Sequence, residues 1–143
     1  MTQMIHAPVR PPWRLRIPVH LAMAAALALK AIPGDPRRTR ARLALARSVR
    51  RLPAADHAHV QEIYRAVIAC QPPWWRGQID CKERSVATVL ATALTGRRCR
   101  LVLGARAMPA AFHAWVVTAD GHPVGNDEAG GHDHPWTPVH TTP

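Results

Sequence analysis

The fold is most constrained by a change of pattern within residues 81–127, from a helical spacing of apolar side chains to strand-like runs. Apolar residues recur at three- and four-residue spacing from about Cys81 to Leu94, which predicts a helix. Strand patterns follow over residues 100–105, 112–118 and 122–125, with an Asp-Gly turn of hairpin chemistry between the last two. One helix followed by short sequential strands predicts an α+β fold.

The remaining segments predict more helix and two irregular ends. Residues 19–32 and 37–52 have helical patterns, and a third helix should begin after Asp56, a good N-cap. Four prolines in residues 1–18 favour an irregular arm with at most a short strand, and residues 74–80 should form a loop. We therefore divide the chain into an arm with a helical extension (1–55), a core (56–129) and a flexible tail (130–143).

Positive charge dominates the surface chemistry. The formal charge is +10, and seven of the arginines lie in residues 37–51. Such a balance attracts nucleic acid, a membrane surface or an acidic peptide, although a solvated helix face explains it equally well. Charge alone therefore names no partner.

The cysteine count and the hydropathy indicate a compartment. The three cysteines contain no Cys-x-x-Cys pair, which argues for a reducing environment and a cytoplasmic protein. The longest apolar run, residues 19–29, is shorter than the roughly 20 residues that span a bilayer, so we expect no membrane association. His132, His134 and His140 lack the fixed spacing of a metal site, and we expect neither a metal nor a cofactor.

Three residues in the central segment have the chemistry of a nucleophile, a base and an orienting acid. Cys81 opens a helix, whose N-terminal N–H groups stabilise a thiolate. His113 lies within an apolar strand, and Asp127 follows the next strand. A thiol needs a nearby base, and the base needs an acceptor that orients it. Asp120 competes with Asp127 for that role, but its Asp-Gly setting favours a turn.

Further residues are candidates for supporting roles. Gln78 lies three residues before Cys81 and could donate to an oxyanion, and Asn126 could help to orient His113. Trp74, Trp75 and Trp115 are candidates for the wall of a peptide groove, although for Trp74 and Trp75 we favour a role in covering the core.

The same motifs resemble a known family. The runs Cys81–Ser85, Arg100–Arg106, His113–Val116 and Gly125–Asp127 resemble the leader peptidases of lasso-peptide biosynthesis, which are transglutaminase-like cysteine proteases. The resemblance covers roughly residues 56–128. It implies a papain-like core, with the cysteine-bearing helix packed on a small antiparallel sheet. The chain departs from the family pattern at Lys82, where an apolar residue is more usual.

The resemblance also implies an activity and partners. Cys81 would be the nucleophile, His113 the general base and acid, and Asp127 the orienter of a peptidase that removes the leader from a ribosomally made precursor. Stand-alone members of that family work with a small separate protein that binds the leader. A macrolactam cyclase resembling asparagine synthetase then closes the ring on the freed core peptide.

The sequence also allows two rival functions. The first keeps the triad but transfers the acyl group to an amine, as in a transglutaminase or amidase. The second is a basic module that binds nucleic acid or peptide without catalysis, but no interleaved aromatic and basic residues support nucleic-acid binding. We therefore expect no nucleic-acid partner.

Overall fold

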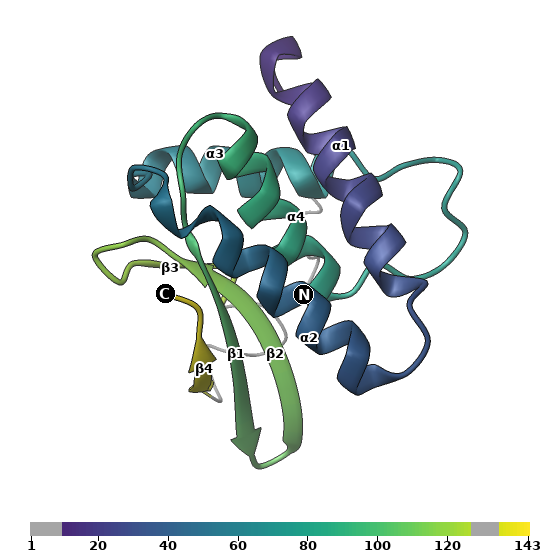
Figure 1. Cartoon of the computed structure of the whole chain (residues 1–143), viewed down its shortest axis with the longest axis vertical. Coiled ribbons are helices and arrows are strands. Elements are labelled where there is room, and N and C mark those ends of the chain that lie inside the picture. The colour runs from purple at the N-terminus through teal and green to yellow at the C-terminus, as the bar shows by residue number, and fades with distance from the viewer. Residues whose placement is uncertain (1–9, 127–134) are drawn as a thin grey trace, which may run out of the picture.

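The computed structural model describes residues 10–126 and 135–143. The helices in chain order are α1 (Trp13–Lys30), α2 (Asp35–Ser48), the 3-10 turn η1 (Val49–Arg51), α3 (His57–Ala69) and α4 (Cys81–Leu94). The strands are β1 (Arg100–Ala107), β2 (Ala110–Val117), β3 (Pro123–Val124) and β4 (Thr137–Thr141). In Figure 1, α4 lies in the middle of the helices, and the β1–β2 hairpin extends beyond them.

The first helix begins earlier than the sequence predicts. An irregular arm was expected up to residue 18, but α1 starts at Trp13 and continues through Pro18. Proline removes one helical hydrogen bond and favours the first turn of a helix. Leu15 and Val19 lie on either side of it and are both buried in the core. Tertiary packing of these two side chains therefore outweighs the local cost of the proline.

The helices α3 and α4 agree with the sequence prediction. Asp56 caps α3, its side chain accepting a hydrogen bond of 2.8 Å from the His59 N–H. The helix α4 runs from Cys81 to Leu94, as the apolar spacing predicted. Residues 74–80 form no helix or strand, which confirms the predicted loop. The second helix differs slightly, because α2 begins at Asp35 and ends at Ser48.

The four strands form an antiparallel sheet in the order β3-β2-β1-β4. The strand β4 corrects the expectation of a flexible tail, because residues 137–141 pair with β1. Thr142 extends this pairing, since its N–H donates to the Leu101 carbonyl over 2.9 Å. The tail has no clear strand pattern, but β4 satisfies the backbone groups along an edge of β1 that would otherwise be open.

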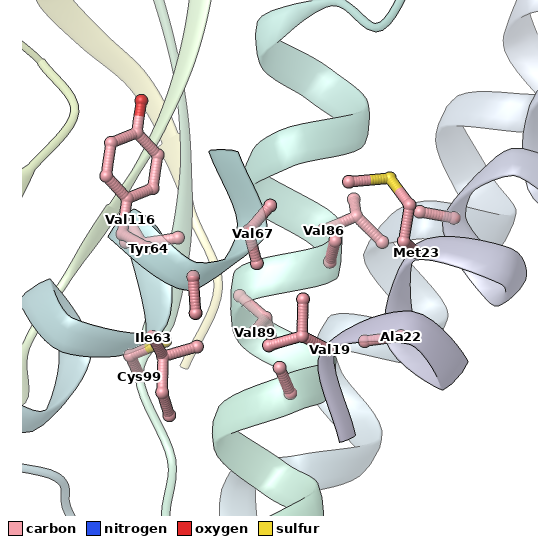
Figure 2. Close-up of a cluster of buried hydrophobic side chains, with 14 of the residues drawn as sticks. Val19, Ala22, Met23, Ile63, Tyr64, Val67, Val86, Val89, Cys99 and Val116 are labelled. Atoms are coloured by element: carbon pink, nitrogen blue, oxygen red, sulfur yellow. The ribbon is translucent and has the colours of Figure 1, made fainter. Parts of the chain in front are cut away.

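One hydrophobic core joins the helices to the sheet. Figure 2 shows Val19 and Met23 of α1 close to Val86 of α4, with Val67 of α3 and Val116 of β2 in the same cluster. The N-terminal helices thus share the core of the segment that follows them. The predicted α+β class, a cysteine-bearing helix packed on a small antiparallel sheet, is confirmed.

No helix within residues 10–126 combines the length and the hydrophobicity needed to cross a bilayer.

Candidate active site

Cys81 is the first residue of α4, and the helix start is well defined. Asp80 and Glu83 form a capping box, in which the Asp80 N–H donates to Glu83 Oε2 over 3.0 Å. The first N–H groups of a helix have no partner within the helix and carry partial positive charge. The sulfur therefore sits at the positive end of the α4 dipole.

Glu83 anchors this helix start to the other helices. Its side chain is almost completely buried and forms ion pairs with Arg42 of α2 and with Lys30 of α1, the latter at 3.6 Å. Lys30 also donates to the Gln78 carbonyl over 2.7 Å. Removing one partner of a buried ion pair costs about 3–5 kcal/mol, because a charge is left uncompensated. The position of Cys81 is thus set by contacts from three segments.

The Cys81 thiol lies against β2. It is hydrogen-bonded to the His113 side chain, and the Ala114 N–H donates to the sulfur. Burial by itself raises the pKa of a thiol. Here the hydrogen bonds from His113 and Ala114, and the positive charges of His113 and Lys82, outweigh that effect, so the pKa of Cys81 lies below its ordinary value. The site therefore favours the thiolate.

Ser85 completes the contact between α4 and β2. It lies one helical turn after Cys81, and its hydroxyl donates to the Ala114 carbonyl over 3.0 Å. The strand β3 pairs only with Val116 and Val117, so it does not cover the edge of β2 at Ala114. The first turn of α4 takes its place there. Both peptide groups of Ala114 bind α4, one through Cys81 and one through Ser85.

His113 is buried, and its orientation is set by the backbone. Its Nε2 lies 2.8 Å from the Gly125 carbonyl oxygen. A carbonyl only accepts, so Nε2 carries a proton and Nδ1 is the nitrogen that can exchange a proton with Cys81. The rings of Trp115 and Trp136 stack against the imidazole, with centroids 5.8 and 4.9 Å away. Aromatic faces favour a neighbouring cation, so this setting suits an imidazolium.

The two candidate aspartates differ in what the structure describes. Asp127 lies outside the described residues, so its predicted role stays a prediction. Asp120 bonds to Thr118 and to His122 in the turn after β2. Four residues of strand separate His113 from the end of β2 at Val117, a span of about 13 Å. Asp120 is therefore a turn residue, as its Asp-Gly setting indicated.

An open cleft of about 890 Å³ lies over the two reactive groups. Its lining includes Cys81, His113, Phe112, and the loop residues Gln78 and Ile79. Gln78 is exposed there, where its side-chain amide could reach an oxyanion. Asn126 is half-buried one residue after the Gly125 carbonyl that orients His113. The roles of Gln78 and Asn126 stay predictions.

The three predicted groove tryptophans do not line this cleft. Trp74 is exposed, and Trp75 packs against the core beside it. Trp115 is buried against Gly104, where an added Cβ would lie 2.4 Å from the indole ring. Trp115 therefore packs in the interior, where its ring stacks against the His113 imidazole.

The sequence analysis did not identify several residues that help to build the site. The Asp80–Glu83 spacing is a readable capping-box signal, but the partners Arg42 and Lys30 are distant in sequence. Trp136 carried no signal because its neighbours are histidine, proline and threonine. Within the described residues, no group of three or more His, Cys, Asp and Glu side chains could hold a metal ion.

Comparison with known proteins agrees with this geometry. The profile of the family described as the transglutaminase-like superfamily matches residues 21–138, which is most of the chain. Searches among curated proteins and among solved structures gave no significant match. The family suggests a cysteine-peptidase or acyltransferase type of activity, in keeping with a thiol hydrogen-bonded to an imidazole. The chain belongs to the transglutaminase-like superfamily.

Proposed function

We propose that the protein is a cysteine peptidase that removes the leader from a ribosomally made lasso-peptide precursor. The observation that carries the proposal is the hydrogen-bonded pair of Cys81 and His113 at the start of α4, beneath an open cleft. Superfamily membership supports the thiol chemistry. The lasso-peptide role rests on the resemblance of the motifs around Cys81, His113 and Asp127.

The reaction proceeds by acyl transfer to water. The Cys81 proton passes to Nδ1 of His113, the thiolate attacks the scissile carbonyl, and the imidazolium then protonates the leaving amine. Water, activated by His113, hydrolyses the thioester and releases the leader carboxylate. The Cys81 N–H and the Gln78 amide are the donors for the oxyanion, each worth about 3 kcal/mol if well aligned. Asp127 joins the Gly125 carbonyl in orienting His113.

The positive charge of α2 and the proposed partners are consistent with a leader peptidase. The arginines of α2 would attract an acidic leader or the small protein that presents it. A cyclase resembling asparagine synthetase would use the freed amino terminus. We place the protein in the cytoplasm, where its three cysteines would be kept reduced.

The test is cleavage of a lasso-peptide precursor in the presence of a small leader-binding protein. We expect mass spectrometry to show a leader fragment with a free carboxylate, and no product with Cys81→Ala. Hydrolysis that persists in Cys81→Ala would contradict the proposal.

Acyl transfer to an amine is the second candidate, because the superfamily includes acyltransferases. Adding glycine methyl ester to the same assay separates the two. A leader fragment that carries the amine, with no hydrolysed fragment, would identify an acyltransferase.

A further inference from the structure

A second cavity adjoins the cleft on the side of β1 and α2. It has a volume of about 150 Å³. Its lining is mostly apolar, and its aliphatic side chains come from three elements besides β2: Leu43 of α2, Val86 of α4, and Leu101 and Leu103 of β1. A cavity of about this size holds a molecule as large as benzene when its walls are apolar. The volume therefore matches one branched or ring-shaped apolar group.

The cavity and the cleft share part of their walls. Lys82, Phe112 and His113 line both. A peptide held with its carbonyl at Cys81 would therefore lie within one side-chain length of the cavity. Phe112 is 81% exposed, an unusual state for a large apolar ring at such a junction. Covering it with a substrate side chain would remove apolar surface from water.

The charges at the cavity do not call for an ionic ligand. Arg42 lines the wall, but its guanidinium is paired with the buried carboxylate of Glu83. Lys82 stands at the rim and is exposed, so it faces water. Among the other lining residues, only Thr39 and His113 have polar side chains, and the Nε2 of His113 is already bonded to the Gly125 carbonyl. A polar side chain placed inside would lose hydrogen bonds to water with little replacement.

We propose that this cavity is a specificity pocket that takes one branched aliphatic side chain of the peptide substrate. The inference rests on the proposed peptidase function, and it adds which class of residue the enzyme selects near the bond it cuts. Full burial of a leucine-sized side chain corresponds to about a 10- to 100-fold preference over alanine.

Tripeptidyl vinyl sulfones provide the test, because they alkylate an active thiolate without needing the natural precursor. In one series, leucine is placed at each of the three positions in turn, with alanine elsewhere. A second series carries asparagine, which has nearly the shape of leucine but is polar. Mass spectrometry follows the rate constant for modification of Cys81. We expect one position at which leucine reacts at least about tenfold faster than asparagine or alanine.

Two variants fill the pocket from different walls, Leu43→Phe on α2 and Leu103→Phe on β1. Either should abolish the leucine preference, provided that its thermal unfolding remains cooperative. Leu94→Phe is the matched control, because Leu94 is exposed and outside the cavity; it should keep the preference. Using both walls keeps the test valid if one variant fails to fold.

Iodoacetamide separates failure of the pocket from failure of the enzyme proposal, because it needs no side-chain pocket. Rapid iodoacetamide labelling of Cys81 without any leucine preference would overturn the pocket alone. A leucine preference that survives both filling variants would also overturn it. A Cys81 that reacts no faster than an ordinary thiol would instead count against the peptidase.

Discussion

Two cysteines lie near the two ends of α4 and have opposite chemistry. Cys81 opens the helix, is half-buried, and has a pKa below the ordinary value because His113, the Ala114 N–H and Lys82 outweigh its desolvation. Cys99 lies just before β1 and is buried, and desolvation raises its pKa to about 12 despite a hydrogen bond to Thr92. Burial opposes the thiolate at both sites, so nearby donors and positive charge distinguish the thiol proposed as the nucleophile from a core thiol.

The strongest test of this contrast removes each sulfur in turn. Cys81→Ala should lower precursor cleavage by about 10⁴-fold or more, since the nucleophile is lost. Cys99→Ala should leave the cleavage rate within a fewfold of the parent, because Cys99 lies outside the cleft. The measurement is the initial rate by mass spectrometry. Equal losses in both variants would show that cleavage depends on the fold and not on the Cys81 sulfur.

Removing the imidazole of His113 should shift the pKa of Cys81 upward, in the direction of the raised pKa of Cys99. His113→Ala should lower cleavage by about 10²- to 10⁴-fold, the usual contribution of a general base. It should also raise the pKa of Cys81, because burial remains while a hydrogen bond and a positive charge are lost.

Alkylation by iodoacetamide across pH measures that shift. Thiolate fraction falls as pH drops through the pKa, so the parent should show its midpoint below about 8.5, the ordinary value for cysteine. The midpoint of His113→Ala should lie higher. An unchanged midpoint would mean that His113 does not control the thiol.

The Gly125 carbonyl can be tested through the backbone that carries it. Gly125 has φ +80°, and an added Cβ would lie 2.9 Å from the Tyr64 ring. Gly125→Ala should therefore displace the carbonyl that orients His113 and lower cleavage by roughly 10- to 100-fold, equivalent to the 1–3 kcal/mol cost of a strained residue.

Gly121→Ala is the matched control for that variant. Gly121 has φ +89°, but an added Cβ would meet nothing within 4 Å. It carries the same backbone strain without the contact at the site, so it should reduce stability but not the cleavage rate of the folded protein. Equal rates for the two variants would remove the role assigned to Gly125.

Ser85 holds Cys81 at β2, and its loss should have a smaller effect. Ser85→Ala leaves the Ala114 carbonyl without its donor, at a cost of about 1–3 kcal/mol. We expect a lower melting temperature and a cleavage rate reduced about tenfold. Ser48→Ala is the control, because Ser48 is exposed and bonds only within α2, to the Leu45 carbonyl. A rate unchanged in Ser85→Ala would show that Cys81 is positioned without it.

The smallest effect concerns Cys99 at high pH. The unfolded chain releases this proton near pH 8.5, whereas the folded protein keeps it until about pH 12. The folded state then binds more protons, so stability falls as pH rises, by about 1 kcal/mol at pH 9.5.

Urea unfolding of the parent and of Cys99→Ala at pH 7.5 and 9.5 measures this loss. The variant should lose less stability than the parent between the two pH values. Cys81→Ala should not reduce the loss, because a lowered pKa contributes stability that is present at high pH and lost as pH falls. Parallel behaviour of the parent and Cys99→Ala would contradict the assignment of a raised pKa to Cys99.

Local sequence determined the elements and the residue types of the site. The apolar spacing predicted α3 and α4, and the Asp-Gly pair predicted the β2–β3 turn. These predictions succeed because caps, turns and periodicity act over a few residues.

Only the tertiary structure decided how the site is assembled. Local pattern could not predict that α1 continues through Pro18 or that the tail adds β4 to the sheet, because buried contacts and an open strand edge favour both. It also could not predict that Gly125 lends a carbonyl to His113, or that Ser85 binds Ala114. Those groups meet across long sequence separations, where the packing of the whole core selects the partner.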